Sequence, residues 1–469
     1  MDIQLYSDSS FAHRNSFLHN RYIYTHSEYS SSISSFAGLC LIHGIFESDY
    51  EVDFAQFDEN KEMGRSRIAV LIGAIQLSVY LATRGCGAGF VICRWLDIRI
   101  GVLVGAILSS GGLLASGYAT AVWQLCLAQG AMVGLGGALS FSAGVDMLDY
   151  LKETHFRPGG IDTSALAVAA AGLGGGALAL AARKLVVSGS TATALRWLAL
   201  MVLCSQCLGA LLMGSANQAA IDETNGADDI DKDAINGKQK QMEMEKGKQH
   251  KMDADDLYIA GAIAQYQHHA NNDSVYRQWV DRLHQTLRNR WFLVSLVSEM
   301  LHHASVFVPP ILLPGYVSTQ LPESSALSGA LLLSVIWFAS ALGGLFISVH
   351  RIPATVQKAP RMTLSLSIWC LWLPAADNWP MLYAFCFVYG LCLGAASKQS
   401  EDDLGDFDLI SAWVRALGCA ISVMIGVPVA SWLFVGIGSG TYYVPAIAFA
   451  AAASLGAAVV SAVARFMPQ

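Results

Sequence analysis

Charged side chains are scarce in this sequence. Of its 469 residues, 14% are Asp, Glu, Lys or Arg and 54% are hydrophobic, whereas an average water-soluble domain carries roughly 25% charged residues. Many of the charges fall within residues 47–67 and 215–290, so the rest of the chain is more apolar still. The formal net charge of −7 also excludes a strongly basic nucleic-acid-binding protein. The scarcity of charge indicates a chain that is folded mainly in lipid.

Patterns for metal or nucleophile chemistry are missing as well. Ten cysteines are present, but those in or beside apolar segments have no histidine at ligand spacing, and we interpret them as small buried side chains. These are Cys93, Cys126, Cys204, Cys207, Cys370, Cys386, Cys392 and Cys419. Adjacent residues on a helix point about 100° apart, so the pair His302 and His303 does not clamp a metal from one face. We therefore predict no enzyme, no cofactor and no metal site.

The first residues also show no pattern that predicts a cleavable signal peptide. Residues 1–32 are rich in Ser, Tyr and His, without a positively charged region followed by an apolar one. We expect them to form a disordered cytoplasmic tail.

Long apolar segments, by contrast, are abundant. A membrane-spanning helix needs about 20 predominantly apolar residues, because its backbone must satisfy its own hydrogen bonds in lipid. Twelve segments fit, of which the first is short: about 33–46, 68–92, 100–117, 122–147, 163–187, 194–214, 291–317, 326–349, 362–376, 380–398, 411–435 and 442–466.

The polar stretch 215–290 divides these segments into two groups of six. This layout predicts an all-α polytopic protein with an N-terminal bundle, 33–214, and a C-terminal bundle, 291–469, as in secondary transporters. Lys and Arg concentrate in the loops after even-numbered spans, so the positive-inside rule puts both termini and the central loop 215–290 in the cytoplasm.

Polar residues inside the spans are the functional candidates, because burying them in a membrane is costly. Candidates for a substrate cavity are Gln129, Ser140, Glu299, His303, Tyr316 and Tyr389. Glu299 and His303 are four residues apart and share a helix face, which suits a paired site that binds a proton. The alternative is a pair that is satisfied internally or faces a loop, with no role in transport.

Glycines in the spans form a second pattern. Gly172-Leu-Gly-Gly-Gly looks like a phosphate-binding loop, but a dinucleotide fingerprint needs glycine at 177, where this chain has alanine, and a preceding strand. In an apolar helix, such glycines let neighbouring helices pack closely. We predict this packing role for Gly130, Gly134, Gly172, Gly174 and Gly426.

Several segments together resemble one known family. They lie in the second, third, fourth, fifth, seventh and eleventh spans: Ile72–Gln76, Gly111–Ser116, Gln129–Gly136, Ala171–Gly175, Val308–Tyr316 and Ile425–Ala430. In order and spacing they resemble the monocarboxylate-transporter-like branch of the major facilitator superfamily, in the form common in fungi. The resemblance implies two six-helix bundles of 11–12 membrane helices that rock about a cavity lined by spans one, four, seven and ten.

The resemblance also implies a function in the plasma membrane. Family members move small organic solutes, here monocarboxylate-like, by proton symport or facilitated diffusion; riboflavin or a secondary metabolite is also compatible. Residues in loops that resemble the family's cytoplasmic gate are Arg94, Asp97, Arg99 and Arg157. The partners implied are the lipid bilayer, the solute and, for a symporter, protons.

Two departures from the family support an alternative. The first span, 33–46, has lost much of the family's apolar length, and Gly344 stands where many members carry an arginine. The alternative is a transport-deficient relative that acts as a sensor or remains as a degenerate copy.

Overall fold

The structure is a computed structural model of the chain. It describes residues 43–46, 50, 67–85, 98–155, 163–211, 280–321, 327–350, 359–372, 378–402, 409–435 and 443–464. The chain divides into two units, one formed by Met1–Leu211 with Trp291–Gln469 and the other by Leu212–Arg290. The expected tail 1–32 lies outside the described residues, and the predicted bundle boundaries stay predictions.

The described residues form helices and contain no strand. After the short turn η1 (His43–Phe46), the first half contains α3 (Arg67–Gly85), α5 (Ile98–Ser116), α6 (Val122–Leu125), η2 (Cys126–Met132), α7 (Val133–His155), α8 (Thr163–Ser188) and an unlabelled helix, Thr191–Leu211. The second half contains α11 (Arg290–Val306), α12 (Val308–Gln320), α13 (Ser328–His350), α15 (Ala359–Ser367), η3 (Ile368–Trp372), α16 (Trp379–Asp402), α17 (Leu409–Val435) and α18 (Val444–Ala464).

These helices match most of the predicted spans. Among the described residues, ten helices are long and apolar enough to cross a membrane, and Met362–Trp372 is a shorter apolar helix at the predicted ninth span. The seventh span is divided at Phe307 into α11 and α12. Of the predicted first span, 33–46, only the turn His43–Phe46 is described.

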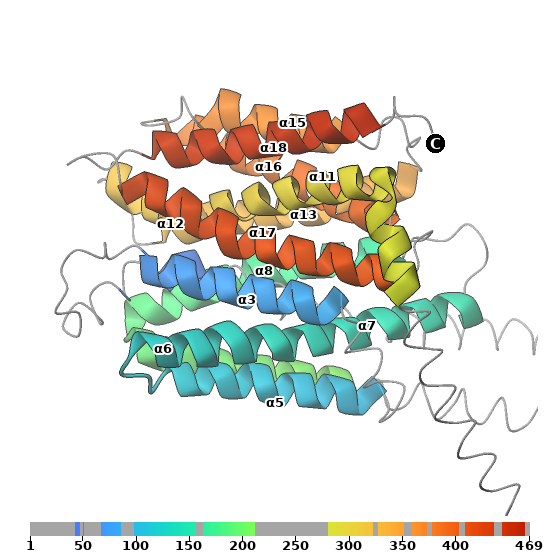
Figure 1. The fold of residues 1–469 in the computed structure, drawn as a ribbon. Coiled ribbons are helices and arrows are strands. Elements are labelled where there is room, and N and C mark those ends of the chain that lie inside the picture. The colour runs from blue at the N-terminus through green and yellow to red at the C-terminus, as the bar shows by residue number, and fades with distance from the viewer. Residues whose placement is uncertain are drawn as a thin grey trace, which may run out of the picture. The chain divides into compact units, whose positions relative to one another are not determined.

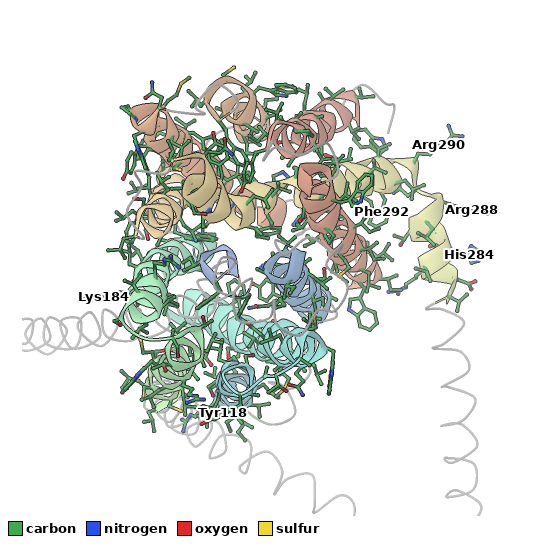
Figure 2. All side chains as sticks on the ribbon, turned by 90° about the vertical axis from the view of Figure 1, so that its left-hand side faces the viewer. Tyr118, Lys184, His284, Arg288, Arg290 and Phe292 are labelled. Atoms are coloured by element: carbon green, nitrogen blue, oxygen red, sulfur yellow. The ribbon has the colours of Figure 1, made fainter. Side chains whose placement is uncertain are left out.

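The outer faces of these helices are apolar. Ile107, Trp123 and Leu211 are 64%, 66% and 74% exposed, and large hydrophobic side chains are exposed on nearly every span. Figure 2 looks along the helices and shows side chains both filling the spaces between them and pointing outward. Water disfavours such surfaces and lipid accommodates them. The chain is an integral membrane protein.

The two halves meet along two helix pairs. The second span α3 packs against the eleventh span α17, and the fifth span α8 packs against the eighth span α13. Figure 1 shows α3 and α8 between the remaining helices of the first half and those of the second half. In two halves of six spans, the second span corresponds to the eighth and the fifth to the eleventh. The contact between spans two and eleven is therefore equivalent to the contact between spans eight and five, as expected for two halves related by a two-fold axis.

Small residues allow these two pairs to pack closely. A Cβ added at Gly172 of α8 would lie 2.5 Å from the carbonyl oxygen of Trp337 and 2.9 Å from the Cβ of Ala341, both on α13. A Cβ added at Gly85, at the end of α3, would overlap the Cβ of Ala416 on α17. Backbones therefore approach to a distance that only glycine permits.

We predict that Gly172→Ala lowers thermal stability, because overpacking at a rigid contact costs about 1–3 kcal/mol. Gly111→Ala on α5 is the matched control, since an added Cβ there meets nothing within 4 Å. The control should unfold at the wild-type temperature or slightly above it, because alanine favours a helix by up to about 1 kcal/mol. Thermal unfolding of both purified variants in detergent checks this, and equal midpoints would contradict the packing assignment.

Candidate functional site

Gln129 lies in the π-helical turn η2 of the fourth span and is buried. Its side-chain oxygen accepts a hydrogen bond from the Tyr50 hydroxyl, and the Tyr50 ring stacks on Phe46 with centroids 5.8 Å apart. Arg183 of α8 donates a hydrogen bond of 3.3 Å to the carbonyl of Ile45. The turn η1 also contacts α3 and α12. The turn His43–Phe46 and Tyr50 thus join the two halves beside Gln129.

Ser140 lies inside the first half. Its hydroxyl is 3.3 Å from Oε1 of Gln206, on the helix Thr191–Leu211, and 3.5 Å from the carbonyl of Val102 on α5. Ser109 of α5 also donates to Gln206 Oε1, at 3.4 Å. Three helices of one half therefore share a buried polar cluster, and this environment explains Ser140 as an interhelical contact.

Tyr316 and Tyr389 belong to an aromatic cluster in the second half. Tyr316 lies edge-on to Tyr443 and Trp372, with centroids 4.9 Å and 6.1 Å apart. Trp372 stacks on Phe385 at 5.2 Å, and Phe385 contacts Tyr389 at 5.3 Å. The cluster joins α12, η3, α16 and the residue before α18, which fixes the positions of both tyrosines.

The hydroxyl of Tyr389 replaces a missing backbone hydrogen bond in the seventh span. Val306 ends α11, and the residue four positions later, whose N–H would pair with its carbonyl in a continuous helix, is Pro310. Proline has no N–H to donate. Tyr389 donates its hydroxyl hydrogen to this carbonyl at 2.5 Å instead. The side chain thereby stabilises the break between α11 and α12.

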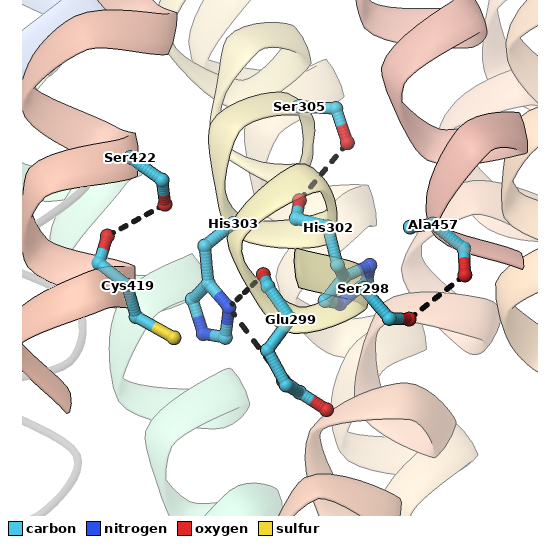
Figure 3. Close-up of polar contacts among 8 residues, drawn as sticks. All are labelled: Ser298, Glu299, His302, His303, Ser305, Cys419, Ser422 and Ala457. Carbon is cyan, nitrogen blue, oxygen red and sulfur yellow. Dashed lines mark hydrogen bonds and ion pairs between the residues drawn. The ribbon is translucent and has the colours of Figure 1, made fainter. Parts of the chain in front are cut away.

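Glu299 and His303 are brought together with a residue that sequence reasoning did not pair with them. His303 Nδ1 is 2.9 Å from the carbonyl oxygen of Glu299 and 3.8 Å from its Oε2. Figure 3 shows the other side of the imidazole facing the sulfur of Cys419, which α17 supplies. One donor atom from each of the three side chains lies within 4.8 Å of the others. No sequence motif signals this group, because its members come from helices far apart in the chain.

The gate candidates are mostly outside the described residues: Arg94, Asp97 and Arg157. Arg99 lies at the start of α5, where it is partly buried, and its gating role stays a prediction. Arg415, also polar and inside a span, is buried on α17 with its guanidinium 5.8 Å from the centre of the Phe292 ring.

The predicted packing glycines have close neighbours where their surroundings are described. An added Cβ would lie 2.8 Å from Ile75 at Gly130, 2.6 Å from the Gln76 carbonyl at Gly134, and 2.6 Å from the Ala304 carbonyl at Gly426. Gly174 is half-buried on α8, the helix that carries Gly172.

The chain has an all-α, major-facilitator-like fold of polytopic membrane proteins. The model is similar to the Escherichia coli xylose transporter XylE in a partially occluded inward-open conformation. The TM-score is 0.63 at 9% sequence identity, over 95% of this chain and 99% of that one.

Sequence similarity to curated proteins is limited to a short stretch. Over 60 residues the chain is 37% identical to human monocarboxylate transporter 12, and this stretch is 13% of the chain and 12% of the human protein. No protein-family model matches the chain.

We predict that Tyr389→Phe lowers stability by about 1–3 kcal/mol, the cost of leaving a buried carbonyl without its donor. Tyr383→Phe is the matched control, because Tyr383 lies on the same helix and is 39% exposed. Thermal unfolding in detergent should separate the two variants. If both unfold at the wild-type temperature, the Tyr389 hydroxyl does not stabilise the helix break.

Proposed function

We propose that this protein is a secondary transporter that carries a small organic solute across a membrane by rocking its two halves. The observation that carries the proposal is the paired contact of α3 with α17 and α8 with α13 in a major facilitator fold. Alternating access in such folds requires the halves to rotate about a site between them.

The composition of the two contacts is compatible with that motion. Gly85 faces Ala416, Gly172 faces Ala341, and Gly344 faces Val168. Surfaces built from small residues do not interlock through long side chains, so they separate and re-form with little repacking.

For the substrate, we propose a monocarboxylate-like solute, moved by proton symport or facilitated diffusion across the plasma membrane, with both termini in the cytoplasm. The support is the 60-residue similarity to human monocarboxylate transporter 12, together with the family resemblance of the span sequences. The bilayer and the solute are the partners that this proposal requires.

The second candidate is a transport-deficient relative, favoured by Gly344. A Cβ added at this glycine would lie 2.7 Å from Cγ1 of Val168, so an arginine there would displace α8. Many members of the family that the sequence resembles carry an arginine at this position, whereas Gly344 lets α13 pack closely against α8 here.

Uptake by cells that lack endogenous monocarboxylate carriers distinguishes the two candidates. We expect saturable uptake of labelled lactate or pyruvate above empty-vector cells, reduced by an excess of unlabelled substrate. Labelled xylose and riboflavin complete the panel and test the substrate class. If surface labelling confirms delivery and no member of the panel is taken up, the transporter proposal is wrong and the transport-deficient candidate stands.

A cross-link between the halves tests the rocking motion directly. The ideal Cβ at Gly344 lies 3.2 Å from the Cβ of Val168, close to the roughly 3.5–4.5 Å that a disulfide needs. In the Val168→Cys/Gly344→Cys double variant, we expect mild oxidation to stop uptake and a reducing agent to restore it. Each single variant should be insensitive to oxidation.

Formation of the cross-link is measured separately from uptake. A protease site introduced within 215–290 cuts the chain between the halves, which then migrate together on a non-reducing gel only when the disulfide has formed. Full uptake by the cross-linked protein would contradict motion between α8 and α13.

A further inference from the structure

We propose that Glu299, His303 and Cys419 form a binding site for a borderline-soft divalent transition-metal ion, with zinc as the best match. The three donor atoms, a carboxylate oxygen, an imidazole nitrogen and a thiol sulfur, lie within 4.8 Å of one another. Two donors come from adjacent turns of α11 and the third from α17. Glu299 and His303 are also candidates for the substrate cavity, but metal binding by the group does not depend on the proposed transport function.

The imidazole is oriented for ligation. A carbonyl oxygen only accepts hydrogen bonds, so the 2.9 Å contact between His303 Nδ1 and the Glu299 carbonyl requires the proton to be on Nδ1. In the neutral ring the lone pair is then on Nε2, and Figure 3 shows that side of the ring facing Cys419. Histidines that bind metals are commonly fixed by such a hydrogen bond from the other ring nitrogen.

The mixture of donors selects the metal. Thiolate and imidazole ligands favour zinc and its soft neighbours, whereas magnesium and calcium prefer oxygen ligands. Tetrahedral zinc places its ligand atoms roughly 3.3–3.7 Å apart. Side-chain rotations that move the donor atoms by about 1 Å would therefore bring all three to bonding distance of one ion. Binding would release the thiol proton of Cys419 to solvent and leave the fourth position open to water.

The three donors are mostly buried, and one of them remains partly accessible. Glu299 and Cys419 are 2% and 5% exposed, whereas His303 keeps 16% of its side chain accessible and offers a route for the ion. The nearby guanidinium of Arg415 lies over Phe292, seven residues before Glu299 and so about 10 Å along the helix. Arg415 is four residues before Cys419 on α17, so its cationic side chain stands one helical turn from the thiol donor.

A bound ion would fix α11 to α17 beside the contact between the halves. Cys419 is three residues after Ala416, the residue that meets Gly85 of α3. Since an ion that binds the folded state stabilises it, zinc should raise the unfolding temperature of the wild-type protein.

The test is cobalt and zinc binding to the full-length protein in detergent, with any affinity tag removed. Co²⁺ should produce a thiolate-to-cobalt charge-transfer band in the near ultraviolet, and Zn²⁺ should abolish it by competition. Cys419→Ser should lose the band while keeping the side-chain volume. His303→Gln and Glu299→Gln should weaken Co²⁺ binding by about 100-fold or more, beyond the 10–100-fold typical for outer-shell partners.

Matched controls use equivalent groups outside the site. His302→Gln changes the adjacent buried histidine, and Cys386→Ser changes a buried cysteine of α16. Both should keep the band and the stabilisation by Zn²⁺, and Mg²⁺ should stabilise none of the proteins. Absence of the band in folded wild-type protein, or its persistence in Cys419→Ser, would overturn the proposal.

Discussion

The structure depends on one constraint, which is that backbone polar groups inside a bilayer must be satisfied by the protein itself. Helices meet this constraint along most of the chain. The informative place is the seventh span, where Pro309 and Pro310 remove two donors from the helix. A hydroxyl from another span, that of Tyr389, supplies the missing hydrogen for Val306. Tyr389, a predicted residue of the substrate cavity, thus takes part in the backbone hydrogen bonding of a broken helix, and its place in a cavity stays a prediction.

Once backbone groups are satisfied within helices, packing decides how the helices associate. Lipid tails are as apolar as leucine, so helices gain most where their backbones come close. Gly105 of α5 and Gly136 of α7 show this reciprocally, since a Cβ on either would collide with the backbone of the other helix. The same principle acts between the halves at Gly172 and Gly344. At Gly344, a Cβ would lie 2.7 Å from Cγ1 of Val168 on α8.

The sequence predicts the membrane-spanning helices well because each of them is a single continuous apolar segment. The sequence predicts a span at 163–187, and the structure has the helix Thr163–Ser188 there. Contacts between helices are not predicted in this way, because the hydrophobic pattern and composition of one helix do not say which other helix packs against it. The pairing of Gln129 with Tyr50, of Ser140 with Gln206, and of His303 with Cys419 all join distant segments. The pair Glu299 and His303 was predictable because both lie on one helix, four residues apart.

Two sets of buried polar residues differ in their surroundings. Ser140 and Tyr389 have contacts that hold helices of one half together. At Glu299, His303 and Cys419 three groups that can each bind or release a proton lie close together, in a span where burying such groups is costly. Stability alone does not require that arrangement, because apolar side chains of similar volume would fill the same space at lower cost. The three donors lie on facing turns of α11 and α17, and the proposed metal ion is a cation that all three could share.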